Sequence, residues 1–524
     1  MSRPGLAVGL SAELVEAAHA ARDAQLADDV PARLLAHDPT LWGPAAEAEA
    51  ARRLGWLDVV ERAGDFLPAL LALRASLQAE GVDQVVLCGM GGSSLAPEVI
   101  CRGAGHPLTV LDSTHPDQVR AALAGDLSRT VVVCSSKSGG TVETDSQRRV
   151  FAQAFTAAGI DPARRIVVVT DPGSPFERLA EDEGYRATFL ADPHVGGRYS
   201  ALTAFGLVPS ALAGVDVEAL LEQAAFAVGS LEDGGPGLLL GAVLGASGRD
   251  KVVLDADAAG LPGFGDWAEQ LIAESTGKQG TGLLPVVVEP GAPEVTDPAA
   301  DVLVVHVGAG DPLPGTSVTG PLAVQMVTWE YAVAVAGRVL GIDPFDQPDV
   351  ESAKQAARGL LDATPGPDPA VFTDGAVEVR GTEGLLDGCA SVGDAVAALL
   401  ATLGPTGYLA VMAYLDRQRD APLADVRGPL ARRTGRPVTF GWGPRFLHST
   451  GQLHKGGPPT GVFLQVTGAV ERDLAIPDRP FTFGGLITAQ AVGDATVLAD
   501  HGRPVLRLHL TSLAGLAQVR AALA

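Results

Sequence analysis

The segment SSKSGGT, residues 135–141, holds the densest group of anion-binding residue types in the chain. Ser136, Ser138 and Thr141 supply three hydroxyls, and the two glycines let the backbone approach a ligand closely. Lys137 adds an ammonium group among them. An apolar run precedes the segment and a helical pattern follows it, so N–H groups at a helix start can join these side chains. The segment predicts a site for one phosphate group; a turn that binds no ligand is the alternative.

A second group of chemically capable residues lies on the helical segment WAEQLIAESTGK, residues 267–278. Gln270 and Glu274 are four residues apart, so they share one face of the predicted helix. A glutamate that precedes a Gly-rich loop can act as a general base when partial burial raises its pKa towards neutrality. A glutamate that only faces solvent is the alternative for Glu274.

Two further segments offer a cation and an amide. In GGRYSAL, Arg198 follows two glycines, where a guanidinium can reach a developing oxyanion. A tight turn around a packed Tyr199 is the alternative. In FDQPDVESAK, Gln347 and Lys354 lie two helical turns apart on one predicted face, and a solvated amphipathic helix is the alternative.

The turn GMGGSS, residues 89–94, follows an apolar run and opens a helical pattern, a place where backbone N–H groups can meet an anion. It fits a dinucleotide fingerprint poorly, because the third glycine of that motif falls on Ser94, although Asp112 at the next strand end keeps a nucleotide alternative open. The segment ESTGKQ does not match a nucleotide P-loop, since Gln279 stands where a magnesium-binding hydroxyl belongs.

The segment HSTGQLHKGG brings His448, His454 and Lys455 into one short stretch. The two histidines have no acidic or cysteine ligand near them in the sequence, which argues against a zinc site. Acid–base catalysis or contacts with sugar hydroxyls fit this composition better.

These candidate residues follow short apolar runs that alternate with helical patterns, which is typical of parallel sheets covered by helices. Functional groups in such folds gather at the carboxyl ends of the strands. We predict an α/β protein with two doubly wound parallel-sheet domains and a smaller carboxy-terminal α/β region, separated from them by a linker at 362–375. The predicted parts are a helical lead-in at 1–80, a first domain with the phosphate loop at 81–214, a second domain with Glu274 at 215–361, and the carboxy-terminal region at 376–524.

Composition excludes several classes of protein. A chain of 524 residues with 47% hydrophobic residues can bury more than one core, and a net charge of −24 disfavours nucleic acid as a partner. The four cysteines form no CxxC pair and are expected to be reduced in a cytoplasmic protein. The amino terminus lacks a secretion signal pattern, and the apolar stretch 321–341 contains Glu330 and Arg338, so we expect a buried helix and no membrane partner.

Taken together and in this order, the motifs resemble those of the glucose-6-phosphate isomerases, within the sugar-isomerase (SIS) domain family. The resemblance covers roughly residues 85–355 and implies two SIS domains. A similar carboxy-terminal region occurs in the isomerase part of transaldolase–isomerase fusions, and this chain is too short to hold a transaldolase barrel as well.

The resemblance implies a role for each candidate. Glu274 would be the base that moves a proton between C2 and C1, Arg198 would stabilise the enediolate, and Lys354 would assist at the ring-oxygen end. No metal and no organic cofactor is implied. The implied substrate contacts are Ser136, Lys137, Ser138 and Thr141 at the phosphate, and Gly92, Ser93, Gly197, Gln270 and Gln347 elsewhere.

One family feature is displaced. The family has a ring-opening histidine between the Glu274 and Lys354 motifs, and the corresponding segment GTSVTGPLAVQMVTWE has none. His306 lies in a strand-like run and is expected to be structural. We predict that the carboxy-terminal region closes over the sugar and supplies His454, with His448 as the alternative.

The resemblance implies an aldose–ketose isomerase that interconverts D-glucose 6-phosphate and D-fructose 6-phosphate in glycolysis and gluconeogenesis. One alternative is an isomerase that also accepts mannose 6-phosphate, and another is a non-catalytic SIS regulator that binds phosphosugars. A regulator needs the phosphate loop but not Glu274, Arg198 and Lys354, so these residues favour the enzyme. A nucleotide-sugar or dinucleotide enzyme is a third alternative. The expected partners are a sugar phosphate and, from the family, a second copy of the chain in a homodimer.

Overall fold

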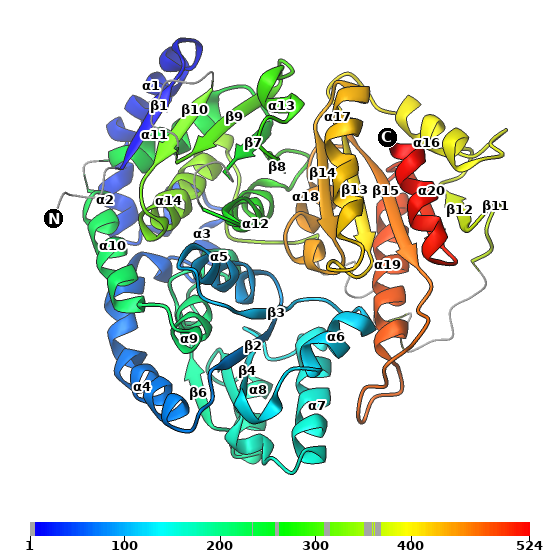
Figure 1. Cartoon of the computed structure of the whole chain (residues 1–524). Helices are drawn as coiled ribbons and strands as arrows, with labels where there is room; N and C mark the ends of the chain where they lie inside the picture. Colours follow the sequence, from blue (N-terminus) through cyan, green and yellow to red (C-terminus); the bar gives the residue numbers. More distant parts are fainter. Residues whose placement is uncertain are drawn as a thin grey trace.

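The computed structural model describes residues 6–232, 234–256, 261–308, 315–349, 359, 361 and 368–524. Within these residues three separate sheets form, and Figure 1 shows them arranged around a common centre. Lys354 and residues 362–367 of the linker predicted at 362–375 lie outside the described residues.

The first sheet is parallel throughout, in the order β3-β2-β4-β5-β6. Its central strands are buried along their whole length, because helices cover both faces, and this explains their uninterrupted apolar sequences. The strands are β2 (Gln84–Gly89), β3 (Thr109–Leu111), β4 (Thr130–Ser135), β5 (Ile166–Thr170) and β6 (Ala187–Leu190). The helices are α5 (Leu95–Gly103), α6 (Pro116–Leu123), α7 (Val142–Ala157), α8 (Pro175–Asp182) and α9 (Ala204–Ala213).

The second sheet has the order β1-β10-β9-β7-β8 and is parallel except for β1. Helix α14 packs against α11, α10 and α12 of this unit, and every residue from Ala323 to Gly337 is buried. The strands are β7 (Lys251–Asp255), β8 (Leu284–Val287), β9 (Val302–Val307) and β10 (Thr316–Thr319). The helices are α10 (Val217–Gly229), α11 (Gly235–Ala246), α12 (Phe264–Thr276), α13 (Pro293–Thr296) and α14 (Leu322–Leu340).

The amino-terminal segment differs from the purely helical lead-in expected from its spacing. Strand β1 (Ala7–Leu10) pairs antiparallel with β10, which lies far along the chain. This pairing provides hydrogen-bond partners for the backbone groups at that edge of the second sheet. Figure 1 shows β1 and α1 beside β10 and α11. The helices that follow are α1 (Ala12–Ala27), α2 (Val30–Leu35), α3 (Glu47–Ala50) and α4 (Val59–Ala79), with short 3₁₀ turns between them.

The third sheet belongs to the carboxy-terminal region and has the order β11-β12-β16-β15-β13-β14. Strands β16, β15, β13 and β14 are parallel, and β12 and then β11 add to them antiparallel beside β16. The strands are β11 (Phe372–Asp374), β12 (Val377–Gly381), β13 (Tyr408–Tyr414), β14 (Val438–Trp442), β15 (Gly461–Gly468) and β16 (Val505–Leu510). The helices are α16 (Val392–Ala401), α17 (Arg427–Thr434), α18 (Gly451–Gly456), α19 (Phe483–Asp500) and α20 (Leu513–Leu523).

The structure bears on two expectations drawn from composition. The stretch 321–341 forms the buried helix α14, and none of the helices in the described ranges combines the length and apolar character of a membrane span. All four cysteines are free thiols, three of them buried and Cys389 partly exposed, as expected.

Candidate active site

A cavity of about 690 Å³ lies where the three units meet. The units built on the first and second sheets, called the SIS-like units below, and the carboxy-terminal region all contribute to its wall. Residues far apart in the sequence therefore face one space. The lining includes twelve of the fourteen candidates named from sequence: Gly92, Ser93, Ser136, Lys137, Ser138, Thr141, Gly197, Arg198, Gln270, Glu274, Gln347 and His448.

The predicted phosphate loop, residues 135–141, lines part of the cavity. It connects the end of β4 to the start of α7, the position at which a parallel strand and a helix both direct backbone donors to a ligand. The Ser136 and Thr141 hydroxyl oxygens lie 2.9 Å apart. Thr141 is the N-cap of α7, and among the described atoms its side chain does not bond the helix start. The first-turn N–H groups of α7 are therefore not satisfied by this cap and favour an anion.

Lys137 is the ammonium group of this loop. Its Nζ donates to Oδ2 of Asp171 at 2.5 Å and lies 3.5 Å from the carbonyl oxygen of Pro193. Burial lowers the pKa of Lys137, and the neighbouring Asp171 opposes that shift. The same burial raises the pKa of Asp171. An arriving phosphate would therefore compete with a carboxylate that already neutralises the lysine.

The candidate base lines the same cavity as the loop. Glu274 is in the last turn of α12, and its Oε2 is 3.3 Å from Nε of Arg198. Both side chains are buried, with about one twentieth of each residue exposed. The guanidinium of Arg198 also donates to three backbone carbonyls in the segment 344–346 and to Oε1 of Gln347. A cation and a carboxylate are thus fixed side by side in a buried part of the cavity.

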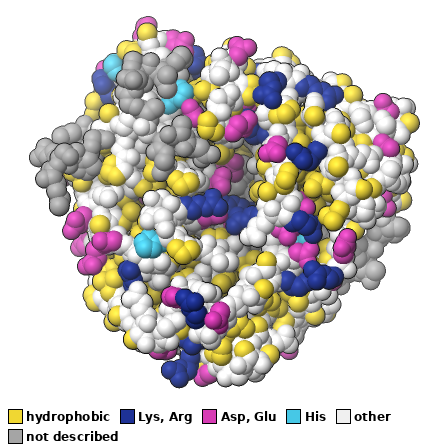
Figure 2. All heavy atoms as spheres, viewed as in Figure 1, with side chains coloured by type: hydrophobic (Ala, Val, Ile, Leu, Met, Phe, Trp, Pro, Cys, Tyr) yellow, Lys and Arg dark blue, Asp and Glu magenta, His cyan; other side chains and the backbone are white. Residues whose placement is uncertain are grey.

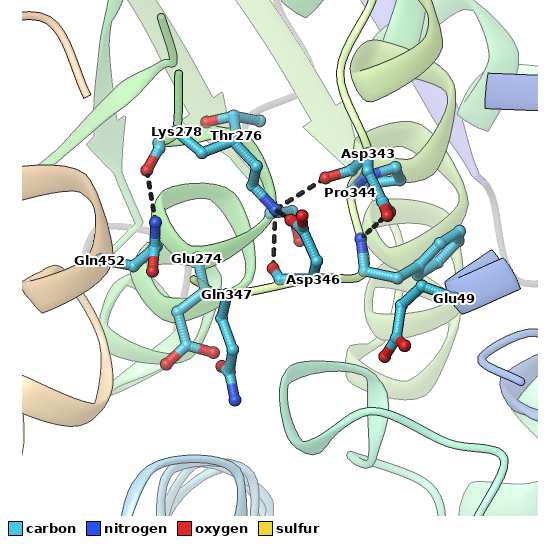
Figure 3. A network of polar contacts seen from close by, with 12 residues as sticks. Glu49, Glu274, Thr276, Lys278, Asp343, Pro344, Asp346, Gln347 and Gln452 are labelled. Atoms are coloured by element: carbon cyan, nitrogen blue, oxygen red, sulfur yellow. Dashed lines mark hydrogen bonds and ion pairs between the residues drawn. The ribbon is translucent and has the colours of Figure 1, made fainter. Parts of the chain in front are cut away.

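The segment that holds Arg198 is itself anchored by a buried lysine. Nζ of Lys278 donates to the carbonyl oxygens of Asp343 and Asp346, each at 2.7 Å, and to Oδ1 of Asp346 at 2.5 Å. Burial and the nearby Arg198 lower the pKa of Lys278 to about 8. Figure 3 shows this network, with the side chains of Glu274 and Gln347 directed to one side of the segment.

The carboxy-terminal region brings a histidine to the cavity. His448 ends a 3₁₀ turn, its carbonyl oxygen accepts from Nε2 of Gln270 at 2.8 Å, and its ring Nε2 lies 3.2 Å from Oε1 of Glu143. Gln490 on α19 donates to the same carboxylate oxygen at 2.7 Å. Glu143, from the first turn of α7, therefore orients His448 next to the phosphate loop.

The other candidate histidine lies elsewhere. His454 on α18 is fully buried against the rings of Tyr408, Phe446 and Phe463, and within the described part of the chain neither ring nitrogen has a hydrogen-bond partner. This burial lowers the pKa of His454 to about 3. The described lining of the cavity includes His448 and not His454. Lys354, the remaining candidate, is outside the described residues.

Sequence reasoning missed several lining residues. Glu143 lies two residues after the phosphate loop and lines the cavity. An acid two residues beyond the N-cap of a helix that follows such a loop could have been recognised in the sequence as a site candidate. Arg53 and Gln490 also line the cavity, but no local motif surrounds them, whereas Lys455 lines it from the segment HSTGQLHKGG. They come from the lead-in and from the carboxy-terminal region, so only the tertiary structure places them at the site.

No family model matches the chain. A probable glucose-6-phosphate isomerase from Haloarcula marismortui is 35% identical over 242 residues, which cover 42% of this chain and 55% of that protein. A glucose-6-phosphate isomerase from Rubrobacter xylanophilus is 31% identical over 374 residues, or 56% of this chain and 86% of that protein. A solved hypothetical protein from Thermus thermophilus has the same fold, with a TM-score of 0.58 at 24% identity over 68% of this chain and 100% of its own.

The two sheets, parallel apart from β1, and the cavity that all three units line agree with the predicted class, a protein of two SIS domains with an additional carboxy-terminal α/β region. The chain spans only about half the length of the Haloarcula relative, whereas it covers most of the Rubrobacter one. It belongs to the glucose-6-phosphate isomerase family.

Proposed function

We propose that this chain interconverts D-glucose 6-phosphate and D-fructose 6-phosphate through an enediolate. The observation that carries the proposal is the pairing of Glu274 with Arg198, 3.3 Å apart, in the cavity that the phosphate loop also lines. A proton next to a carbonyl is too weak an acid for a carboxylate in water, so the enediolate needs a fixed cation and a water-poor site. The buried Glu274 and Arg198 supply both.

The proposed reaction begins with ring opening. The C1–O5 bond breaks while His448, oriented by Glu143, moves a proton from O1 to O5. Glu274 then removes the C2 proton, the electron pair forms the C1–C2 double bond, and the negative charge that develops on O1 lies next to Arg198. The base returns the proton to C1, and the proton of the O2 hydroxyl passes to O1, which leaves the ketone at C2.

A coupled assay that detects glucose 6-phosphate formed from fructose 6-phosphate tests this proposal. We expect turnover by the wild type and a loss of about 10²–10⁴-fold in kcat for Glu274→Gln, the range of a general base. Unchanged turnover in the variant would remove Glu274 from the reaction. A wild type that binds sugar phosphate, shown by a raised Tm, but turns none over would support the SIS regulator instead.

Three narrower statements stay predictions. Activity on mannose 6-phosphate, measured in the same assay format, tests the breadth of the substrate set. Light scattering on the purified chain tests the expected homodimer. Fractionation of cells tests the expected cytoplasmic location.

A further inference from the structure

The phosphate end of the cavity contains a second cation that does not belong to the phosphate loop. Arg53, in the turn after α3, lines the cavity with Lys137. Its Nη1 donates to the carbonyl oxygen of Pro193 at 3.2 Å, and Nζ of Lys137 lies 3.5 Å from the same oxygen. One oxygen atom can therefore contact both cations at once.

The backbone holds Arg53 in this place. Leu54 forms an antiparallel bridge with Val195, and the N–H of Gly55 donates to the carbonyl oxygen of His194 at 3.2 Å. The lead-in thus docks directly on the segment that contributes the shared carbonyl. The side chain of Arg53 is about one quarter exposed, which leaves it free to turn towards a ligand.

The charges at this end cancel in the absence of substrate. Arg53 donates to Glu49 at 2.7 Å, as Lys137 does to Asp171 at 2.5 Å, and all four side chains line the cavity. A phosphate ester carries close to two negative charges at neutral pH. Without Arg53 the side chains that line this end would be two carboxylates and one lysine, and a dianion would meet a net negative lining even though Arg52 pairs with Glu49 from outside the described lining.

We propose that Arg53 is a phosphate-binding residue, which leaves Glu49 when substrate arrives and shares the phosphate oxygens with Lys137. A guanidinium suits this role because its planar fork matches a phosphate and stays charged on burial, whereas burial lowers the pKa of Lys137. The inference rests on the proposed function for the sugar part of the ligand, but not for the phosphate itself.

Arg52 provides a matched control. It also donates to Glu49, at 2.6 Å, but its side chain is two-thirds exposed, and it is absent from the described lining of the cavity. Arg53→Met and Arg52→Met each remove one cation from the same carboxylate. Only the first removes a cation from the cavity.

The experiment measures binding of inorganic phosphate by calorimetry and KM for fructose 6-phosphate, both on the full chain. We expect Arg53→Met to raise the phosphate Kd and the KM about tenfold, equivalent to ~1.4 kcal/mol, with little change in kcat, and Arg52→Met to change neither by more than about twofold. Equal Kd values for Arg53→Met and the wild type would overturn the proposal. Because phosphate binding is measured without turnover, a chain that fails as an isomerase still tests Arg53.

Glu49→Gln tests the direction in which phosphate affinity changes. This substitution removes the competing charge but keeps an acceptor for Arg53, so phosphate binding should become tighter, by about threefold or more. If the Arg53–Glu49 pair were only structural, breaking it from either side would weaken phosphate binding in both variants. Weaker binding in Glu49→Gln would therefore contradict the proposal.

Discussion

The two sides of the cavity are constructed differently. On the SIS side, the polar groups lie in short contiguous segments at strand and helix ends, such as the phosphate loop at 135–141 and the end of α12. On the carboxy-terminal side, a single turn carries His448, and it is held by side chains of the other two units. The first side depends on local loop geometry, and the second depends on how the units dock.

On the carboxy-terminal side, a buried arginine holds the turn that carries His448. Nη1 of Arg445 donates to Glu98 at 2.5 Å and to Asp112 at 2.6 Å, and Nη2 donates to Asp266 at 3.1 Å. These carboxylates come from α5, from the loop after β3 and from α12, so one guanidinium joins all three units three residues before His448. Figure 2 shows basic and acidic side chains gathered at the centre of one face, where the units adjoin. The position of His448 therefore depends on these ion pairs.

The largest effect is expected on the SIS side. Arg198→Met should lower kcat about 10²–10³-fold, because the enediolate loses its fixed cation. Proton abstraction then remains the slow step, so substrate deuterated at C2 should show a primary isotope effect at least as large as that of the wild type. Steady-state rates with labelled and unlabelled glucose 6-phosphate measure it. A normal kcat would show that Arg198 has no part in the chemical step.

A smaller loss with a different signature is expected on the other side. His448→Ala should lower kcat by roughly 100-fold on the cyclic substrate. This is the lower end of the rate contribution that a general acid–base group makes. Because ring opening would become the slow step, the isotope effect at C2 should fall towards one. An isotope effect that stays at the wild-type value would contradict a ring-opening role for His448.

His454→Phe is the control for that variant. The ring of His454 packs among aromatic side chains and makes no hydrogen bond that the described residues show, so phenylalanine preserves its packing. We expect kcat and the isotope effect to remain within about twofold of the wild type. A large loss here would return His454 to the list of catalytic candidates.

Arg445→Met should lower kcat less than His448→Ala does and more than His454→Phe does. We expect roughly tenfold lower kcat and a reduced isotope effect, because a displaced turn would misplace His448. Arg427 is the matched control, since it is a buried arginine of the same region and pairs with Glu294 at 2.5 Å and Glu289 at 2.6 Å of the second unit.

Both arginine variants remove a cation from buried carboxylates and should lower Tm, although Arg417 stays within 3.5 Å of Glu98 and 3.4 Å of Asp112 when Arg445 is replaced. Only Arg445→Met should change the isotope effect. If Arg427→Met changes it equally, the effect reports general undocking of the region and not the position of His448. Arg445→Lys, which keeps the charge, should recover part of the loss.

The same contrast explains how much the sequence could predict. Each strand expected from an apolar run before residue 310 is present, and the phosphate loop joins β4 to α7 as expected, because these features depend on neighbours in the chain. Strand β1 was not predicted, since its partner β10 lies some three hundred residues away. Its sequence alone carries no signal for that pairing.

The histidines show the limit most clearly. His448 and His454 share one short segment, and the prediction placed His454 at the sugar with His448 as the alternative. Which of them faces the cavity depends on the docking of α18 and the preceding turn, where Gln270 binds the His448 carbonyl and aromatic rings enclose His454. Arg53 and Gln490 likewise reach the site only through contacts between units.

The smallest effect concerns stability and pH. Burial, with the charges of Lys455 and Arg503 nearby, lowers the pKa of His454 to about 3, whereas an unfolded histidine titrates near 6.5. Between these values the unfolded chain binds a proton that the folded chain excludes. The free energy of unfolding should therefore fall as pH decreases from about 6.5 towards 3, by up to ~1.4 kcal/mol per pH unit from this residue, with no contribution above pH 7.

His454→Phe removes this contribution, so the Tm difference between the variant and the wild type should shift in favour of the variant as pH is lowered from 7 to 5. Parallel Tm profiles over that range would mean that His454 takes up its proton without leaving the fold, and that its aromatic enclosure opens in acid.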